Sequence, residues 1–378
     1  MSMNLPTTPA QPYPPVPEPA VFRVAFAGCG AISALHLAGV IAQPHVRLVA
    51  VADPDAAAAS ALADEAANLS GQPAPLVFPS LSELLAACPV DAVHILTPHF
   101  THVDLAIEAL AAGCHVLVEK PVGIDPESLQ RLKEAAARSR GQLGVCLQNR
   151  YNFASQAAQQ LLAAGQFGEV LGARAFVTWW RDPPYYTESP WRGRWSSEGG
   201  SLMINQALHT LDLLLWLAGP ASTVTGHIFN DHLQGIIETE DTATAHFHLQ
   251  NGATAVFYAT TAFPNSMDPL LDIICEQAMI RIEGSDRITV FDRQGNLLPG
   301  FTQRIKTEED PTAELAARLL PPDKAYWGKS HAILIADFYR HIQMGQGFGL
   351  DAVEGSRALE TLLAWYASSQ QGHVVKLS

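Results

Sequence analysis

The sequence predicts an α/β protein with a parallel sheet in its first half and a large, mostly antiparallel sheet in its second half. Two observations predict the parallel sheet: short, almost continuously apolar strands, and helical segments between them. Strands of this kind are buried on both faces. A third observation predicts the antiparallel sheet, because the dipeptide Asn251-Gly252 between two long β segments is a strong hairpin signal.

The first predicted domain covers residues 21–150. In its segment 101–112, apolar residues recur at helical spacing, and similar segments separate the expected strands. This alternation is typical of a dinucleotide-binding fold. The expected strands are 21–27, 46–53, 91–97, 115–120 and 142–148.

The second predicted domain covers residues 151–378. A helix over 153–164, a strand over 172–180 and a helix over 200–218 precede the β segments 242–249, 253–262, 270–276, 278–283 and 287–291. Two amphipathic helices follow, and we expect them to pack back on the core. Their stripes are Ile335, Phe338, Tyr339 and Ile342, and Leu359, Leu362, Leu363 and Tyr366.

Composition limits the possible partners and location. Residues 1–20 carry seven prolines and are expected to form a disordered arm, or alternatively an arm that wraps a neighbouring subunit. The net charge of −14 argues against nucleic acid or an anionic membrane as partner. We expect a cytoplasmic protein, because we find no secretory signal and no apolar run long enough to span a membrane. The five cysteines lack CxxC spacing, and no metal site is predicted.

A glycine-rich turn predicts the cofactor. The motif GCGAIS (28–33) follows the first strand and opens a helix. Gly28 would allow the tight turn and Gly30 the close approach of a pyrophosphate, which helix N-termini attract. Ala31 and Ile32 complete the predicted contacts.

Asp53 ends the second strand, where a carboxylate can bind ribose hydroxyls and repel a 2′-phosphate. NAD is therefore favoured over NADP. A helix N-cap is compatible with the same position.

Lys120 is the predicted catalytic base. It lies in Glu119-Lys120-Pro121, at the end of the strand 115–120 and near an expected ligand-binding edge. Removal of a hydroxyl proton during hydride transfer needs a base whose pKa is near neutrality, and burial would lower that of lysine. The alternative is a surface lysine that ends a strand.

A second cluster lies in the predicted helix 200–218. Asn205 and His209 are four residues apart and would share a face. Gly199-Gly200 would allow the helix to approach a cofactor or sugar closely. His209 could instead be an ordinary core histidine.

The segment 178–195 is rich in aromatic and basic residues and carries four of the seven tryptophans. Aromatic faces stack on sugar rings, and guanidinium groups bind hydroxyls, carboxylates or phosphates. The alternative is an aromatic core within a loop. The predicted substrate contacts are Arg181, Tyr186, Trp191, Arg192 and Asn205.

Together these motifs resemble the glucose–fructose oxidoreductase and inositol dehydrogenase (Gfo/Idh/MocA) family. The resemblance runs from about Phe22 to the C-terminus and includes GCGAIS, residues 97–121, QNRYN (148–152), AGQFGEV (164–170) and GGSLMINQALHTLD (199–212). It implies a Rossmann domain followed by an α/β domain whose open sheet forms homodimers or homotetramers. It also implies catalytic Lys120 and His209, with cofactor contacts from Thr97, Pro98, His102, Glu119 and Gln148.

One position departs from the family pattern. Many members have aspartate where this chain has Asn205, so Asn205 is expected to orient a substrate hydroxyl while Lys120 or His209 is the base. The leading hypothesis is an NAD-dependent oxidoreductase that interconverts a ring secondary alcohol and ketone of a sugar, nucleotide-linked sugar or cyclitol. The alternatives are an NAD-dependent glycosidase that uses transient oxidation, and a non-catalytic NAD-sensing regulator.

Overall fold

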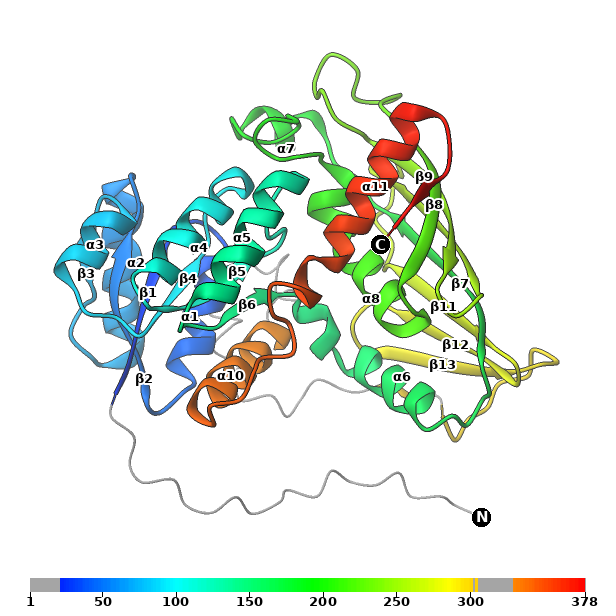
Figure 1. Cartoon of the computed structure of the whole chain (residues 1–378), viewed down its shortest axis with the longest axis horizontal. Coiled ribbons are helices and arrows are strands. Elements are labelled where there is room, and N and C mark those ends of the chain that lie inside the picture. Colours follow the sequence, from blue (N-terminus) through cyan, green and yellow to red (C-terminus); the bar gives the residue numbers. More distant parts are fainter. Residues whose placement is uncertain (1–20, 302, 305–328, 378) are drawn as a thin grey trace.

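The computed structural model describes residues 21–301, 303–304 and 329–377, and it contains both predicted sheets (Figure 1). The predicted arm over residues 1–20 lies outside the described residues. A six-stranded parallel sheet comes first along the chain, and a nine-stranded sheet that is mostly antiparallel follows. The predicted fold class is therefore confirmed.

The parallel sheet has the strand order β3-β2-β1-β4-β5-β6. The order reverses between β1 and β4, and ligands of doubly wound sheets bind at the carboxyl ends of the strands beside such a point. The strand β3 was not predicted from the sequence. The six strands are β1 (Phe22–Ala27), β2 (Val46–Ala52), β3 (Leu76–Phe78), β4 (Ala92–Ile95), β5 (His115–Glu119) and β6 (Leu143–Cys146).

Three helices of this domain begin at side-chain caps that the sequence provides. Asp55, Ser80 and Asp125 accept hydrogen bonds from main-chain amides in the first turns of α2, α3 and α5. The helices, with one short 3-10 turn, are α1 (Ser33–Ile41), α2 (Ala56–Ser70), α3 (Leu81–Ala87), η1 (His99–Thr101), α4 (His102–Ala111) and α5 (Pro126–Arg138).

The nine-stranded sheet has the order β14-β13-β12-β11-β7-β10-β9-β8-β15, and only the pair β7–β10 is parallel. The predicted hairpin joins β9 to β10, and Gly252 in its turn has a φ of +87°. The strands are β7 (Val170–Thr178), β8 (Ala221–Phe229), β9 (Thr242–Leu249), β10 (Thr254–Thr260), β11 (Leu270–Cys275), β12 (Ala278–Glu283), β13 (Arg287–Asp292), β14 (Gln303–Arg304) and β15 (Val375–Lys376).

Helices cover one face of this sheet. Trp365 of α11 packs its ring against Phe247 and Phe257, with ring centroids 5.8 and 5.7 Å apart.

The predicted helix 200–218 is divided into a π-helical turn and an α-helix. The remaining elements are η2 (Gln148–Tyr151), α6 (Phe153–Ala163), α7 (Pro183–Thr187), η3 (Leu202–Ala207), α8 (Leu208–Ala218), α10 (Lys329–Gln343), η5 (Glu354–Ser356) and α11 (Arg357–Gln371).

The helix α10 returns to the parallel-sheet domain (Figure 1). It packs against α1, where a Cβ atom on Gly39 would lie 2.5 Å from Ile335 Cδ1. Glycine at this position therefore allows the two helices to approach closely. Phe338 of α10 likewise lies over Gly144 of β6.

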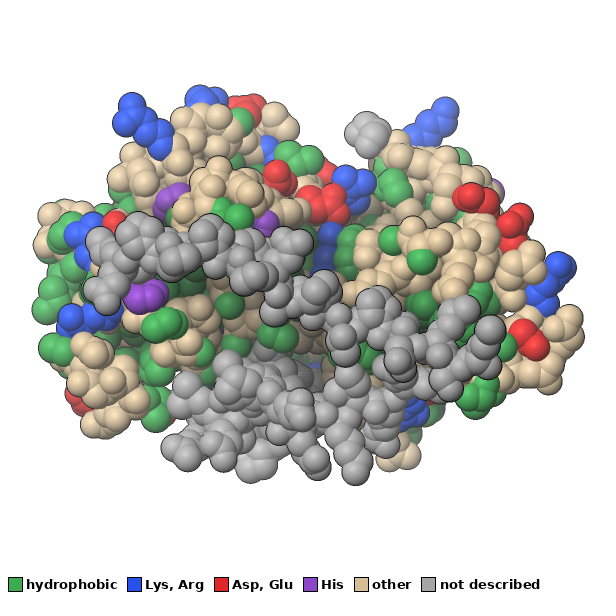
Figure 2. Space-filling view, turned by 90° about the horizontal axis from the view of Figure 1, so that it is seen from below, with side chains coloured by type: hydrophobic (Ala, Val, Ile, Leu, Met, Phe, Trp, Pro, Cys, Tyr) green, Lys and Arg blue, Asp and Glu red, His purple; other side chains and the backbone are tan. Residues whose placement is uncertain are grey.

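A membrane-spanning helix must be long and apolar. Across the described parts of the chain, no helix combines the length and the apolar character needed to cross a bilayer. The face in Figure 2 carries acidic and basic side chains in small scattered groups where it is not covered by grey atoms.

Candidate functional site

The glycine-rich turn between β1 and α1 has the shape that a pyrophosphate needs. Gly28 has a φ of +99°, and a Cβ there would lie 2.6 Å from the carbonyl oxygen of Leu96. At Gly30 no protein atom lies within 4 Å of the Cβ position, so the space above the turn is open. Ala31 and Ile32 lead directly into α1. The turn therefore fits a dinucleotide with its pyrophosphate at the helix N-terminus.

Asp53 lies directly after β2, beside this turn. Its Oδ2 accepts a hydrogen bond from the Cys29 amide at 2.7 Å, and its Oδ1 accepts one from the Asp55 amide at 2.8 Å. The carboxylate is thus fixed next to the glycine-rich turn. Its remaining lone pairs can accept ribose hydroxyls.

The segment after β4 links the glycine-rich turn to Lys120. Gly28 packs on the main chain at Leu96 and Thr97. The buried His102 ring lies 2.7 Å from the carbonyl oxygen of Thr97 on one side and 2.7 Å from that of Pro121 on the other. Predicted cofactor residues from β1, β4 and β5 are therefore gathered at one edge of the sheet, with Pro98 in the same segment.

Lys120 follows β5 and points toward the second domain. Its Nζ donates to the main-chain oxygen of Asn205 at 2.7 Å, and the Asn205 Oδ1 lies 3.4 Å from Nζ. Burial lowers the pKa of Lys120 below that of an ordinary lysine, while the carboxylates of Glu119 and Glu198 act in the opposite direction. A lysine with a lowered pKa is a better base near neutral pH.

His209 lies close to the same point. Its Nε2 is 3.2 Å from the Nε2 of Gln148, whose amide group donates to the ring nitrogen. Burial, and next the positive charge of Lys120, hold the pKa of His209 well below its usual value. The imidazole is therefore neutral at pH 7. Asn205 in η3 thus faces Lys120, and His209 in α8 faces Gln148.

Glu119 belongs to a buried network under the site. Its Oε1 lies 3.0 Å from His36 Nε2 and 3.3 Å from His331 Nε2. These two histidines hold the pKa of Glu119 well below its usual value despite its burial. The chain of contacts continues from His36 to His94 at 2.8 Å, and from His94 to Tyr339 at 2.6 Å.

This network also contains a group of side chains of the kinds that bind metals. The ligand atoms of His36, Glu119, Cys146 and His331 all lie within 4.8 Å of one another. If each group from Tyr339 through the two histidines donates to the next, Glu119 accepts the last hydrogen bond. Hydrogen bonding of this kind satisfies His36 and one oxygen of Glu119.

In the segment 178–195, called the aromatic loop below, arginine side chains stack on aromatic rings. Arg181 lies 5.2 Å above the Tyr185 ring, and Arg192 lies 4.1 Å above it. Trp191 lies next to Arg192, with the guanidinium 5.5 Å from its ring centroid. Tyr186 instead points into a small core. Its buried ring packs against the Tyr185 ring and the side chains of Leu233 and Ile237.

Sequence reasoning missed two residues near Asn205. The buried Glu198 accepts a hydrogen bond from Asn205 Nδ2 at 2.6 Å, and the Tyr185 hydroxyl lies 3.5 Å from the same nitrogen. The only sequence signal for Glu198 is its place before Gly199-Gly200. These glycines make room for protein rather than ligand, since Cβ atoms there would meet Ile124 at 2.6 Å and the Tyr366 hydroxyl at 2.3 Å.

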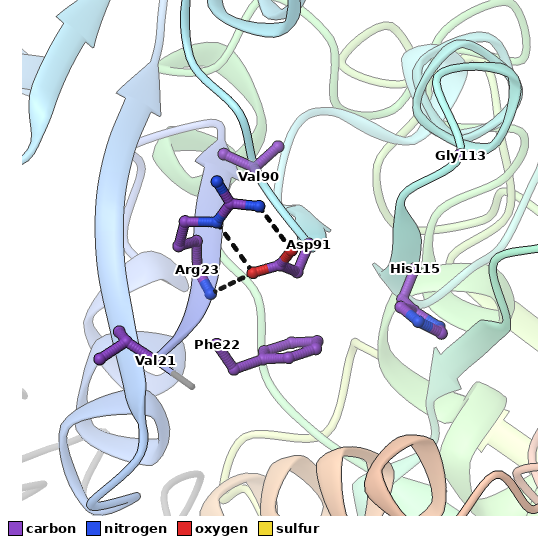
Figure 3. A pocket seen from close by; sticks show the side chains of 7 residues that line it. All are labelled: Val21, Phe22, Arg23, Val90, Asp91, Gly113 and His115. Atoms are coloured by element: carbon purple, nitrogen blue, oxygen red, sulfur yellow. Dashed lines mark hydrogen bonds and ion pairs between the residues drawn. The ribbon is translucent and has the colours of Figure 1, made fainter. Parts of the chain in front are cut away.

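A separate hollow of about 610 Å³ lies at the opposite edge of the parallel sheet (Figure 3). Arg23 and Asp91 face one another there, with Arg23 Nε and Nη2 donating to the carboxylate at 3.0 and 2.8 Å. His115 lies at the start of β5, so this hollow is at the amino ends of the strands. None of the predicted site residues lines it.

Comparison with known proteins identifies the family. Residues 22–147 match the model of an oxidoreductase family with an NAD-binding Rossmann fold, and residues 155–281 match the GFO/IDH/MocA C-terminal domain. The chain belongs to the Gfo/Idh/MocA family. Its parallel-sheet domain is the family's NAD-binding domain, in agreement with the shape of the glycine-rich turn.

Three relatives illustrate the family. An inositol 2-dehydrogenase of Corynebacterium glutamicum is 30% identical over 52% of this chain and 54% of its own. A D-glucoside 3-dehydrogenase of Escherichia coli is 28% identical over 55% of this chain and 57% of its own. The chain thus matches little more than half of the length of these relatives. The WlbA dehydrogenase from Bordetella pertussis, solved with NADH and UDP-GlcNAcA, has a TM-score of 0.79 and 27% identity over 95% of this chain and 98% of its own.

Proposed function

We propose that this protein is an NAD-dependent dehydrogenase that interconverts a ring secondary alcohol of a sugar, nucleotide-linked sugar or cyclitol with its ketone. One observation carries the proposal. The Lys120 amine, with its lowered pKa, lies at the carboxyl edge of an NAD-binding sheet and faces Asn205 of the second domain. The named relatives act on, or are bound to, molecules of these classes.

Lys120 and His209 are the two acid–base groups of the proposed reaction. When bound, NAD supplies the acceptor for the hydride that leaves the carbinol carbon. In the oxidation direction the neutral Lys120 amine accepts the hydroxyl proton. The neutral His209 ring, placed by Gln148, can hold the same hydroxyl or exchange a proton with it. Asn205 orients the substrate hydroxyl and the lysine together.

The aromatic loop favours a substrate with an anionic group. Arg194 pairs with Glu238 at 3.6 Å, whereas Arg181 and Arg192 donate to the main-chain oxygens of Trp180 and Tyr185. Among the described residues, these two guanidinium groups donate to carbonyl oxygens and stack on aromatic rings, and neither forms an ion pair with a carboxylate. A carboxylate or phosphate would bind them well.

The experiment is a substrate panel with NAD⁺ and the purified full chain. It compares neutral pyranosides and inositols with uronates and nucleotide-linked sugars, and it follows nicotinamide absorbance. We expect turnover, with higher kcat/KM for the anionic members. No absorbance change with any member would refute the dehydrogenase. Release of an aglycone without net NADH would favour the glycosidase alternative instead.

We also propose that the protein is a homo-oligomer that associates through the bare face of the nine-stranded sheet. Among the described residues, α6, α8 and α11 pack on the other face (Figure 1). The bare face exposes large apolar side chains on its central strands, including Val256 (45% exposed) and Ile274 (38% exposed). Arg174, which pairs with Asp272, lies beside Val256, so the proposed interface combines apolar and charged side chains.

A further inference from the structure

Glu198 is a buried carboxyl group that the reaction proposed above does not yet use. It lies in the loop before η3 and is fully buried. Its Oε2 accepts a hydrogen bond from the Gly193 amide at 2.5 Å, and its Oε1 accepts one from Asn205 Nδ2 at 2.6 Å. Its main-chain oxygen accepts one from His99 Nδ1 at 2.9 Å. Both the carboxyl group and its loop are therefore fixed in place.

The bond from Asn205 to Glu198 decides which way the Asn205 amide points. The ionised Glu198 carboxylate has no proton to donate, so in that state the NH₂ end of the amide must face Glu198. The oxygen end then faces Lys120, where Oδ1 lies 3.4 Å from Nζ. A chain of three side chains thus runs from a buried negative charge to the lysine. If the amide were reversed, its N–H donors would face the ammonium group.

We propose that Glu198 is a positioning residue for Lys120: through Asn205, it fixes the direction of the lysine amine and sets how tightly that amine holds its proton. This inference rests on the function proposed above. Glu198 touches no reacting atom in this scheme. Its charge acts on Lys120 partly through the amide and partly through space.

Several charged or titratable groups surround Glu198. Burial raises the pKa of Glu198 to about 7, and the nearby Glu240 carboxyl acts in the same direction, whereas Arg192, Gly193 and Asn205 favour the ionised form. The carboxyl group is therefore ionised in an increasing fraction of molecules above pH 7. The other groups that interact with it are Lys120, Tyr186, Tyr366 and His99.

The first test is Glu198→Gln in the full chain. Its carbonyl can still accept from Gly193, but its NH₂ group would meet that of Asn205 and reverse the Asn205 amide. We expect kcat to fall by about 10²-fold, as for other small misplacements of a reacting group, while NAD⁺ affinity stays within about twofold. The rising limb of the pH–rate profile should move to lower pH, because a lost negative charge lowers the pKa of Lys120.

Glu188→Gln is the matched control. Glu188 lies ten residues before Glu198 and is exposed. We expect this variant to keep the wild-type rate and pH profile. If Glu198→Gln also keeps both, the inference is wrong.

A charge swap separates positioning from folding. Asn205→Asp alone puts a second carboxyl group beside Glu198, and like charges at this distance repel. In Glu198→Gln/Asn205→Asp, the new amide donates to the new carboxylate and still accepts from Gly193. We expect the double variant to recover at least about tenfold over Asn205→Asp, since the paired hydrogen bonds are restored. A double variant no faster than Asn205→Asp would overturn the inference.

A measurement without substrate separates this inference from the proposed function. Lys120 as a whole residue is of intermediate exposure, and a small acylating reagent probes its amine. Mass spectrometry then gives the extent of acylation at Lys120 as a function of pH. We expect the midpoint to be lower in Glu198→Gln than in wild type, even if no sugar is turned over. Equal midpoints would contradict the role of Glu198, whatever the enzyme's substrate proves to be.

Discussion

Lys120 lies where proton transfer is proposed, and its replacement tests that role at the scale of one residue. In Lys120→Ala the alcohol proton has no basic amine to accept it. We expect kcat/KM to fall by about 10²- to 10⁴-fold, the usual contribution of general base catalysis. NAD should still bind, because the glycine-rich turn and Asp53 are untouched. Steady-state kinetics and titration of protein fluorescence with NADH measure the two effects separately.

The control for this variant is Lys376→Ala, whose side chain is exposed on β15. It should leave both kinetics and cofactor affinity unchanged. Near-normal turnover in Lys120→Ala would refute the proposed base. Loss of cofactor affinity together with activity would indicate that Lys120 acts mainly in cofactor binding.

At the scale of the element, the turn from β1 to α1 contains two glycines with different physical roles. Gly28→Ala introduces a side chain at φ +99° and within 2.6 Å of the Leu96 oxygen. We expect a loss of at least about 1 kcal/mol in the free energy of unfolding, since L-residues avoid this region of φ. Gly30→Ala meets no protein atom. It should therefore spare stability and weaken NAD binding.

The two variants are controls for one another. In thermal unfolding without cofactor, Gly28→Ala should have a lower Tm than wild type, and Gly30→Ala should have the same Tm as wild type. Calorimetric titration with NAD should show a clear loss of affinity in Gly30→Ala at unchanged Tm. Equal NAD affinity in Gly30→Ala and wild type would place the pyrophosphate elsewhere.

The sequence predicts those elements whose signals are local. The GCGAIS turn and the Asn251-Gly252 hairpin fall where the residue pattern predicts them. The strand β8 was missed because its pattern includes Gly226, which weakens a strand signal. Glycine is needed there because Trp365 lies within 2.4 Å of the Cβ position. Only the distant helix α11 explains that requirement.

The candidate site was predictable to a similar extent. Lys120 stands out because it ends a strand next to proline, and the structure brings it to Asn205. Glu198 carries no local pattern that relates it to a lysine far along the chain. Its position depends on the loop before η3 and on the packing of Gly199-Gly200 against Ile124 and Tyr366. Tertiary packing of this kind is not encoded in any short motif.

At the scale of the whole molecule, Arg150 connects three separate parts of the chain. From η2 it donates to both carboxylate oxygens of Asp212 in α8, at 2.8 and 2.6 Å, and to Glu354 in η5 at 2.8 Å. Arg150→Met would leave the buried Asp212 charge without a partner. We expect a loss of about 3–5 kcal/mol in the free energy of unfolding near neutral pH.

The pH dependence of this loss has a definite sign. Without Arg150, burial raises the pKa of Asp212 above its unfolded value, so the penalty is present at neutral pH and shrinks as the pH falls and the carboxyl is protonated. Urea unfolding at several pH values measures it. Arg131→Met is the control, because its pair with Asp104 is exposed and contributes about 1 kcal/mol or less. A loss in Arg150→Met that does not depend on pH would contradict this account.

Association through the bare sheet face is also a property of the whole molecule. Val256 is 45% exposed at the centre of that face, on β10, and an aspartate there would replace an apolar contact of the proposed interface with a charge. We expect wild type to sediment as a dimer or tetramer and Val256→Asp to dissociate toward monomer at micromolar concentration. Val77→Asp is the matched control, because Val77 is 42% exposed on the edge strand β3 of the other sheet. It should keep the wild-type assembly. A monomeric wild type would contradict the proposed association. An assembly that Val256→Asp leaves intact would show that the contact lies elsewhere.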